Sequence, residues 1–124
     1  DLKFSDSALK VAEKNFRAAL TVLDSFFLKT NDFLIGQHAT IADISAYAEI
    51  GQMQPHYTDV FDLSEFPCIC SWLQRMSKLG GYEPAHCALK ELGSIKDKAP
   101  GIESMKSSTI AGAKAISEAV KSFL

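Results

Sequence analysis

The sequence predicts an all-α fold, and three observations lead to that prediction. Apolar residues recur in steps of three and four along several segments, the spacing that gathers them on one face of a helix. Residues that start or stop helices, namely Thr, Pro and Gly, stand between those segments. No segment shows the strict alternation of a half-buried strand. We therefore expect these 124 residues to form a helical bundle.

The composition excludes several classes of function. Hydrophobic residues make up 47% of the chain and charged residues 23%, the balance of a soluble globular protein. The net charge is −2 and the cations are scattered among acids, so we expect no nucleic-acid partner. The apolar runs are far too short to span a membrane. An odd number of cysteines favours a reducing, cytoplasmic setting, and Asp1–Phe4 lacks a signal-peptide core and looks like the start of a fragment.

The first predicted helix lies within residues 5–30 and ends in the turn-forming residues 30–32. Glu13 precedes Arg17 by one turn in the favourable order on its polar side, which also includes Asp24. The apolar stripe consists of Leu9, Ala12, Phe16, Ala19, Leu20, Leu23, Phe26 and Phe27.

A capping box predicts the start of the second helix, over 41–53. Thr40 is a good N-cap, and Asp43 stands three residues later, where its carboxylate can bond the backbone N–H of the cap. Its charge also suits the positive end of the helix dipole. The helix is apolar on nearly every side, so we expect its neighbours to bury most of its faces. We interpret Thr40 and Asp43 as folding residues rather than catalytic ones.

Two shorter helices follow a turn-rich connection over 54–64. The third begins at Pro67, where a missing N–H does no harm, and ends at Gly80. We expect Pro67 and Trp72 to be structural core residues, and the inner stripe to contain Ile69, Trp72, Leu73, Met76 and Leu79. The fourth has Pro84 in its first turn and Gly93 just past its end.

The last segment is a linker over 94–101 followed by a strongly amphipathic helix over 102–123. Small residues at 111–113 permit close approach of another helix. This helix either packs back on the bundle, which we favour, or pairs with a partner helix; its apolar seam contains Ile102, Met105, Thr109, Gly112 or Ala113, Ile116, Val120 and Phe123.

The order of these features resembles a known family. The stretches FLIGQHATIADISAYAEI (33–50), FPCICSWLQRM (66–76) and YEPAHCALKELG (82–93) are similar to the all-helical C-terminal domain of cytosolic glutathione transferases, most of all the theta-like members. The resemblance covers about residues 8–93, and it depends on the capping box followed by Pro67, Trp72 and Arg75. We accordingly divide the chain into a helical domain over 1–95 and a linker with a C-terminal helix over 96–124.

The resemblance implies that this chain is part of a glutathione transferase-like protein. Family members join such a domain to a thioredoxin-like N-terminal domain, which holds the co-substrate glutathione and activates its sulfur. The helical domain supplies scaffold and the apolar wall of the electrophile pocket. The thioredoxin-like domain is absent from these residues and the family's first helix has no room before Asp1, so we expect neither glutathione binding nor catalysis by this chain alone.

Similar domains also serve as noncatalytic interaction modules in translation elongation factor and aminoacyl-tRNA synthetase complexes, which is the alternative function. For either function a homodimer or a helix-mediated protein partner is possible, and no membrane partner is expected. A carrier of apolar ligands is a third hypothesis. The family pairs the capping box with a bulky apolar residue before the cap, where this chain has Ala39, so the hydrophobic staple with Ile44 should be weak.

We expect no catalytic residue and no metal site. Two of the cysteines, Cys68 and Cys70, point to different sides of a helix, and Cys87 does not face its neighbour His86. The remaining histidines, His38 and His56, are expected in solvated loops. Two tyrosines, Tyr47 and Tyr57, either edge a ligand cleft or belong to the core.

Overall fold

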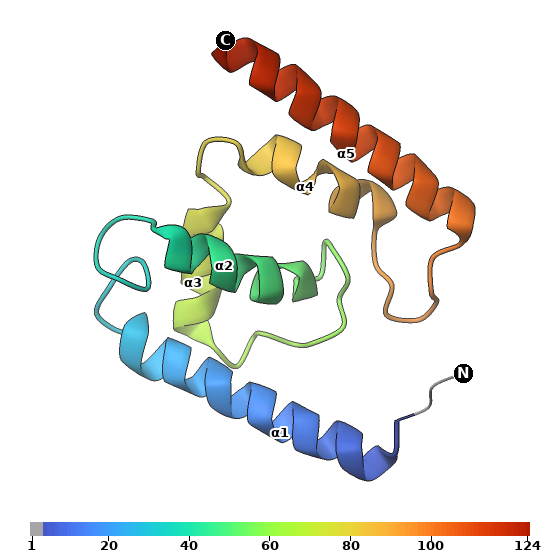
Figure 1. The fold of residues 1–124 in the computed structure, drawn as a ribbon. Helices are drawn as coiled ribbons and strands as arrows, with labels where there is room; N and C mark the ends of the chain where they lie inside the picture. The colour runs from blue at the N-terminus through green and yellow to red at the C-terminus, as the bar shows by residue number, and fades with distance from the viewer. Residues whose placement is uncertain (1–3) are drawn as a thin grey trace.

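The computed structural model describes residues 4–124, apart from the Phe123 side chain, and in that range it contains helices and no strand (Figure 1). The helices are α1 (Asp6–Val22), α2 (Ile41–Ile50), α3 (Pro67–Met76), α4 (Tyr82–Leu92) and α5 (Ile102–Phe123). This confirms the predicted all-α fold. The predictions for residues 1–3 and for the Phe123 side chain in the apolar seam lie outside the described part.

The helices are arranged around a central pair. Figure 1 shows α2 and α3 in the middle, α1 along one side, and α4 with α5 on the other side, with α5 outermost. The core lies between these helices and the loop that joins α2 to α3 (54–66), and its buried apolar residues are Leu20, Leu28, Leu34, Tyr47, Ile50, Tyr57, Leu63, Phe66, Ile69, Trp72, Leu73, Met76 and Tyr82.

A π-helical turn, Leu23–Phe27, changes the phase of the first helix. The N–H of Leu28 donates to the Leu23 carbonyl at 2.9 Å. The acceptor is five residues earlier in the chain, whereas in an α-helix it is four residues earlier. The predicted inward residues Phe26 and Phe27 are therefore exposed, the former to 74%, and Leu28 is buried in their place. The turn also makes Asp24 half-buried, whereas we expected it on the solvated side.

Asp24 caps α3 from a distance in the sequence. Its Oδ1 accepts a hydrogen bond from the Ile69 N–H at 3.0 Å, while the local N-cap residue, Phe66, makes no side-chain cap. The expectation that Pro67 is a core residue is wrong, because its ring is exposed at the first position of the helix. Pro67 contributes a preset helical backbone angle there, whereas burial comes from the following turns.

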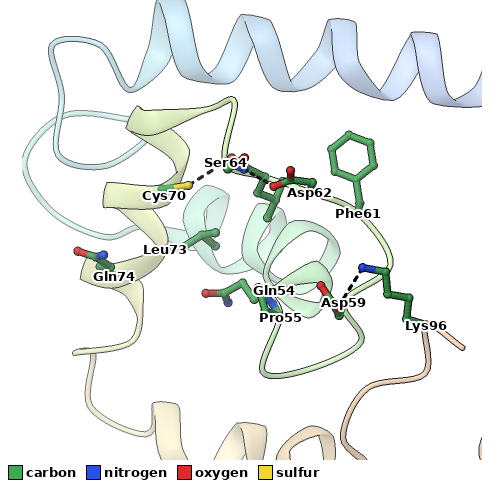
Figure 2. A pocket seen from close by; sticks show the side chains of 11 residues that line it. Gln54, Pro55, Asp59, Phe61, Asp62, Ser64, Cys70, Leu73, Gln74 and Lys96 are labelled. Carbon is green, nitrogen blue, oxygen red and sulfur yellow. Dashed lines mark hydrogen bonds and ion pairs between the residues drawn. The ribbon is translucent and has the colours of Figure 1, made fainter.

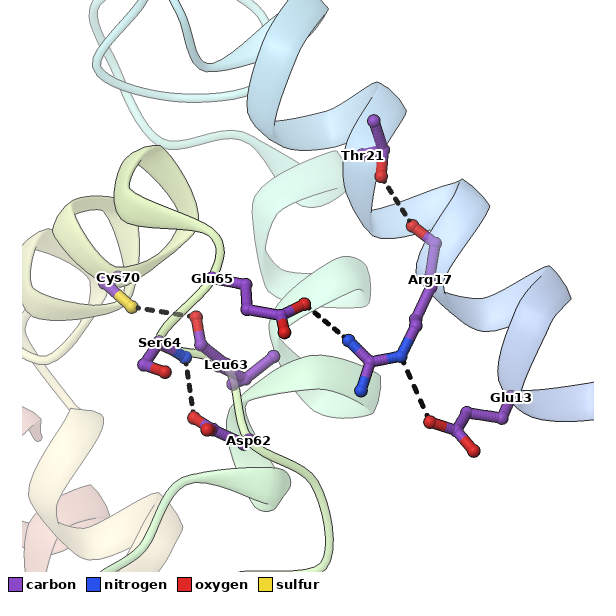
Figure 3. Close-up of polar contacts among 8 residues, drawn as sticks. All are labelled: Glu13, Arg17, Thr21, Asp62, Leu63, Ser64, Glu65 and Cys70. Carbon is purple, nitrogen blue, oxygen red and sulfur yellow. Dashed lines mark hydrogen bonds and ion pairs between the residues drawn. The ribbon is translucent and has the colours of Figure 1, made fainter. Parts of the chain in front are cut away.

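Arg17 connects α1 to the loop before α3, as Figure 3 shows. Its guanidinium bonds Glu13 one turn earlier at 3.1 Å and Glu65 across the interface at 2.6 Å. The same group lies 4.8 Å from the centroid of the Phe61 ring, a cation–π distance. These groups are largely exposed, so their ion pairs contribute little to the free energy of folding. Their main effect is to hold the loop beside α1.

The C-terminal helix packs along α4, and the contact includes Gly112 of the predicted seam but not its larger residues. Its contact face consists of small residues, in which Ser108 and Gly112 are buried and Ala111, Ala115 and Ala119 half-buried. A Cβ on Gly112 would lie 2.8 Å from the Ala88 Cβ, so only glycine permits this approach. The larger residues of the predicted seam remain exposed, among them Ile102, Met105, Ile116 and Val120.

Candidate functional site

The carboxylate of Asp43 joins three parts of the chain. Its Oδ1 accepts hydrogen bonds from the Leu34 N–H and the Trp72 indole N–H, both at 2.9 Å. Its Oδ2 accepts from the Thr40 N–H at 2.9 Å and from the Thr40 hydroxyl at 3.1 Å, and that hydroxyl oxygen accepts from the Ala42 N–H. The start of α2, the preceding loop and the middle of α3 therefore meet at one side chain.

This carboxylate is buried and remains ionised. Asp43 is 0% exposed and Trp72 is 1% exposed. Burial raises the pKa of Asp43, but the hydrogen bonds from Leu34, Thr40 and Trp72 together outweigh it, so the pKa lies below its usual value. Both carboxylate oxygens accept hydrogen bonds from groups that the fold holds in place. The arrangement therefore suits a structural anchor better than a group that transfers a proton to a substrate.

Neighbouring contacts keep the loop before α2 in place. The Arg75 Nε donates to the Asp32 carbonyl at 2.7 Å, and the Phe33 N–H donates to the Gly36 carbonyl at 2.9 Å. Gly36 has φ of 98°, a left-handed conformation that favours glycine. The loop thereby returns to place the backbone of Leu34 against the carboxylate.

One face of α2 is left uncovered, which corrects the expectation that the helix is buried on most sides. Asp43, Tyr47 and Ile50 are buried, but Ile41 is 76% exposed and Ile44 57% exposed. In the described part of the chain, no helix or loop covers this face. The small side chain of Ala39 offers Ile44 little to pack against as a hydrophobic staple.

A cavity of about 410 Å³ lies between the 54–64 loop and α3, and Figure 2 shows its lining. Cys70 Sγ lies in its wall and donates to the Leu63 carbonyl at 3.3 Å. Burial, together with the carboxylates of Asp24 and Asp62, raises the pKa of the Cys70 thiol. A thiol that stays protonated is a poor nucleophile, so this cavity holds no activated cysteine.

The other cysteines and histidines are not brought together. Cys68 lines a different surface hollow from Cys70, and Cys87 a different one from His86. The loop histidines at 38 and 56 are exposed. Among the described residues, no group of three His, Cys, Asp or Glu side chains could hold a metal ion.

A tyrosine cluster begins one turn after Asp43 on the same buried face of α2. The hydroxyl of Tyr82 is 2.6 Å from the hydroxyls of both Tyr47 and Tyr57. Tyr57 is fully buried, whereas Tyr47 and Tyr82 line a small cavity together with His86. Sequence reasoning did not connect Tyr82 with His86, although their spacing of four residues on one helix indicates a common face.

The fold and the Asp43 anchor define a class of protein: an all-α domain organised around a central helix, buried on one face, whose capping carboxylate also binds the tryptophan of the next helix. Residues 4–79 match the family model described as Glutathione S-transferase, C-terminal domain. That match spans more than half of the chain, so the chain belongs to this family. It ends before α4 and does not extend to the resemblance we saw over 82–93. Comparisons with curated proteins and with solved structures gave no match.

Proposed function

We propose that this chain is the C-terminal domain of a glutathione transferase-like protein and that it forms, with a thioredoxin-like domain, the binding site for an electrophile. The family supports this role, because such domains work beside a thioredoxin-like domain and glutathione is the co-substrate of the intact proteins. In this proposal the helical chain supplies scaffold and apolar wall, and the other domain holds the thiolate that attacks the electrophilic carbon.

The observation that carries the proposal is the uncovered face of α2. Ile41 and Ile44 are exposed, Ala48 continues the face one turn later, and Ile35 is exposed in the loop just before the helix. Isoleucine side chains grouped in this way favour a neighbouring domain over water, since each full burial contributes about 2 kcal/mol. A second domain packed there would complete the enclosure that the composition of α2 predicts.

A cytoplasmic setting belongs to the same proposal. Cys68, Cys70 and Cys87 are free thiols, as expected in a reducing compartment. In the described part of the chain, none of the helices has the length and apolar character needed to cross a membrane.

The test is a fusion of a theta-type thioredoxin-like domain ahead of this chain, assayed for conjugation of glutathione to 1-chloro-2,4-dinitrobenzene. We expect turnover by the fusion and none by the 124 residues alone. Ile41→Asp should abolish most of the turnover without lowering the melting temperature, because aspartate is favourable in the first turn of a helix. Ile110→Asp, which changes an isoleucine of similar exposure on α5, is the matched control. Equal effects of the two substitutions, or turnover by the chain alone, would contradict the proposal.

The noncatalytic interaction module remains a second candidate, and the exposed stripe on α5 favours it. The stripe lies on one face of the helix that α4 does not cover, because its members are spaced by three, eleven and four residues, close to whole helical turns. It consists of Ile102, Met105, Ile116 and Val120. If a partner helix covers this stripe, the chain should assemble through it. Sedimentation velocity of the wild type and of Ile116→Glu checks this, and identical monomer profiles would leave the module without support from α5.

A further inference from the structure

The tyrosine cluster has a fixed hydrogen-bond direction at one end. The Gln54 side-chain nitrogen donates to the Gly51 carbonyl and to the Tyr47 hydroxyl oxygen, both at 2.9 Å. A carbonyl can only accept, so the orientation of the Gln54 amide is settled. Tyr47 in turn pairs with Tyr82, and Tyr82 with Tyr57.

The number of hydroxyl hydrogens in this cluster exceeds the number of contacts between hydroxyl groups that can use them. Tyr47, Tyr57 and Tyr82 carry one hydroxyl hydrogen each, and the two contacts between them use two of the three. Burial raises the pKa of both Tyr47 and Tyr57, so neither loses its hydrogen at physiological pH. Among the described residues the third hydrogen has no acceptor.

Burial decides which hydroxyl keeps the unused hydrogen. Tyr57 is 0% exposed, and an unpaired donor there would bear the full desolvation penalty. The favoured arrangement therefore has Tyr57 donating to Tyr82, which leaves the free hydrogen on Tyr82 or on Tyr47. Both of these side chains line the adjacent cavity.

That cavity has the size and lining of a site for a small ligand. Its volume is about 260 Å³, whereas a 150 Å³ apolar cavity is known to hold benzene, so a substituted single ring fits. The His86 ring stacks on Tyr82 with centroids 4.1 Å apart. The His86 Nδ1 lies 2.8 Å from the Tyr82 carbonyl, so Nδ1 carries a hydrogen. No Asp, Glu, Lys or Arg belongs to the lining, and its aliphatic part consists of Ile44, Ala48, Met76, Leu79 and Ala85.

We propose that this cavity binds a small uncharged aromatic ligand with one carbonyl-type acceptor, and that the free phenol hydrogen of Tyr47 or Tyr82 recognises that acceptor. The site goes beyond the proposed conjugation function, because all its groups belong to this chain and no second domain is needed for binding. Its ligand is held by one hydrogen bond in a pocket whose other walls are mostly apolar, an arrangement that gives orientation along with affinity.

Acetophenone and cumene, which have the same number of heavy atoms and differ in having or lacking the carbonyl oxygen, are the probes. Both are titrated into the ¹⁵N-labelled 124-residue chain, with the amides of Gly80, Gly81 and Ala85 as reporters. The measured quantity is the ratio of the two dissociation constants, because desolvation of the free probes enters it equally for every variant. Removal of both pocket phenols by Tyr47→Phe with Tyr82→Phe should weaken acetophenone relative to cumene by about fivefold, the worth of one net hydrogen bond.

Tyr57→Phe is the matched control, because the remaining pair of tyrosines still has one hydrogen more than it can use. It should leave the ratio unchanged. Independently of any variant, the carbonyl stretching band of acetophenone should move to lower frequency on binding to the wild type. The proposal is overturned if neither probe shifts the reporter amides, if the double variant keeps the wild-type ratio, or if the carbonyl band does not move. None of these outcomes depends on conjugating activity.

Discussion

Replacing Asp43 with asparagine should lower the free energy of unfolding by about 2–4 kcal/mol at pH 7. In its best orientation the new amide oxygen keeps the bonds from the Leu34 N–H and the Trp72 indole. The amide nitrogen then faces Thr40, whose hydroxyl can rotate to accept but whose backbone N–H cannot. One donor left unpaired costs about 1–3 kcal/mol, and two charge-assisted bonds become weaker neutral ones, which accounts for the rest.

The matched control is Glu49→Gln, the same chemical change at an exposed position of the same helix. It should change the free energy of unfolding by less than about 0.5 kcal/mol. Urea unfolding followed by far-UV circular dichroism measures both variants, with the slope against urea checked for constancy. If Asp43→Asn proves as mild as Glu49→Gln, the carboxylate does not hold the three segments together and our account of the core is wrong.

The pH dependence of the same variant gives an independent check. The folded-state pKa of Asp43 is lowered, so its contribution to stability is fully present above the unfolded-state value of about 4 and is lost as the pH falls below it. The difference between wild type and Asp43→Asn should therefore shrink as unfolding is repeated below about pH 4. A constant difference down to pH 3 would show that the carboxylate charge contributes nothing.

Three further perturbations test the packing. Gly112→Leu should detach α5 from α4, seen as a lower melting temperature and faster proteolysis of the tail, whereas Ala113→Leu, one residue along on the exposed side, should do neither. Gly51→Ala places a methyl group 2.4 Å from a tyrosine ring and should cost about 1–3 kcal/mol, while Gly101→Ala enters open space and should be neutral; equal unfolding midpoints would contradict this. Deletion of 102–124 should lower the melting temperature, and an unchanged melting curve would show that α5 adds no stability.

Local sequence patterns predicted the helices well because their signals act over one or two turns. The apolar stripe of α3 is a direct example, since Ile69, Trp72, Leu73 and Met76 are buried as expected and only Leu79, past the helix end, is half-buried. The π-helical turn at the end of α1 has no comparable signal. Its single extra residue depends on how the chain meets α3, where Asp24 caps the helix, so the faces of Phe26 and Phe27 could not be read from spacing.

Contacts between distant segments were the part that spacing could not supply. The residues joined by the Trp72–Asp43 bond and by the tyrosine cluster are 25 to 35 positions apart. Over that distance helical spacing does not show which side chains will face each other. The tail helix shows the same limit in another form. The helix α5 has two faces without charged residues, one of small side chains and one of larger apolar side chains. The small face packs on α4, because glycine at 112 permits the close approach.

The inner and outer faces of α2 differ in what they contribute to folding. Its inner face is complete within this chain, because Asp43 finds all its donors here and Tyr47 and Ile50 are buried. Its outer face lacks a cover but has no buried polar group that depends on one, so leaving it in water costs only apolar exposure. The chain should therefore fold by itself, and the proposed second domain would bind by burying Ile41 and Ile44 without being required for folding.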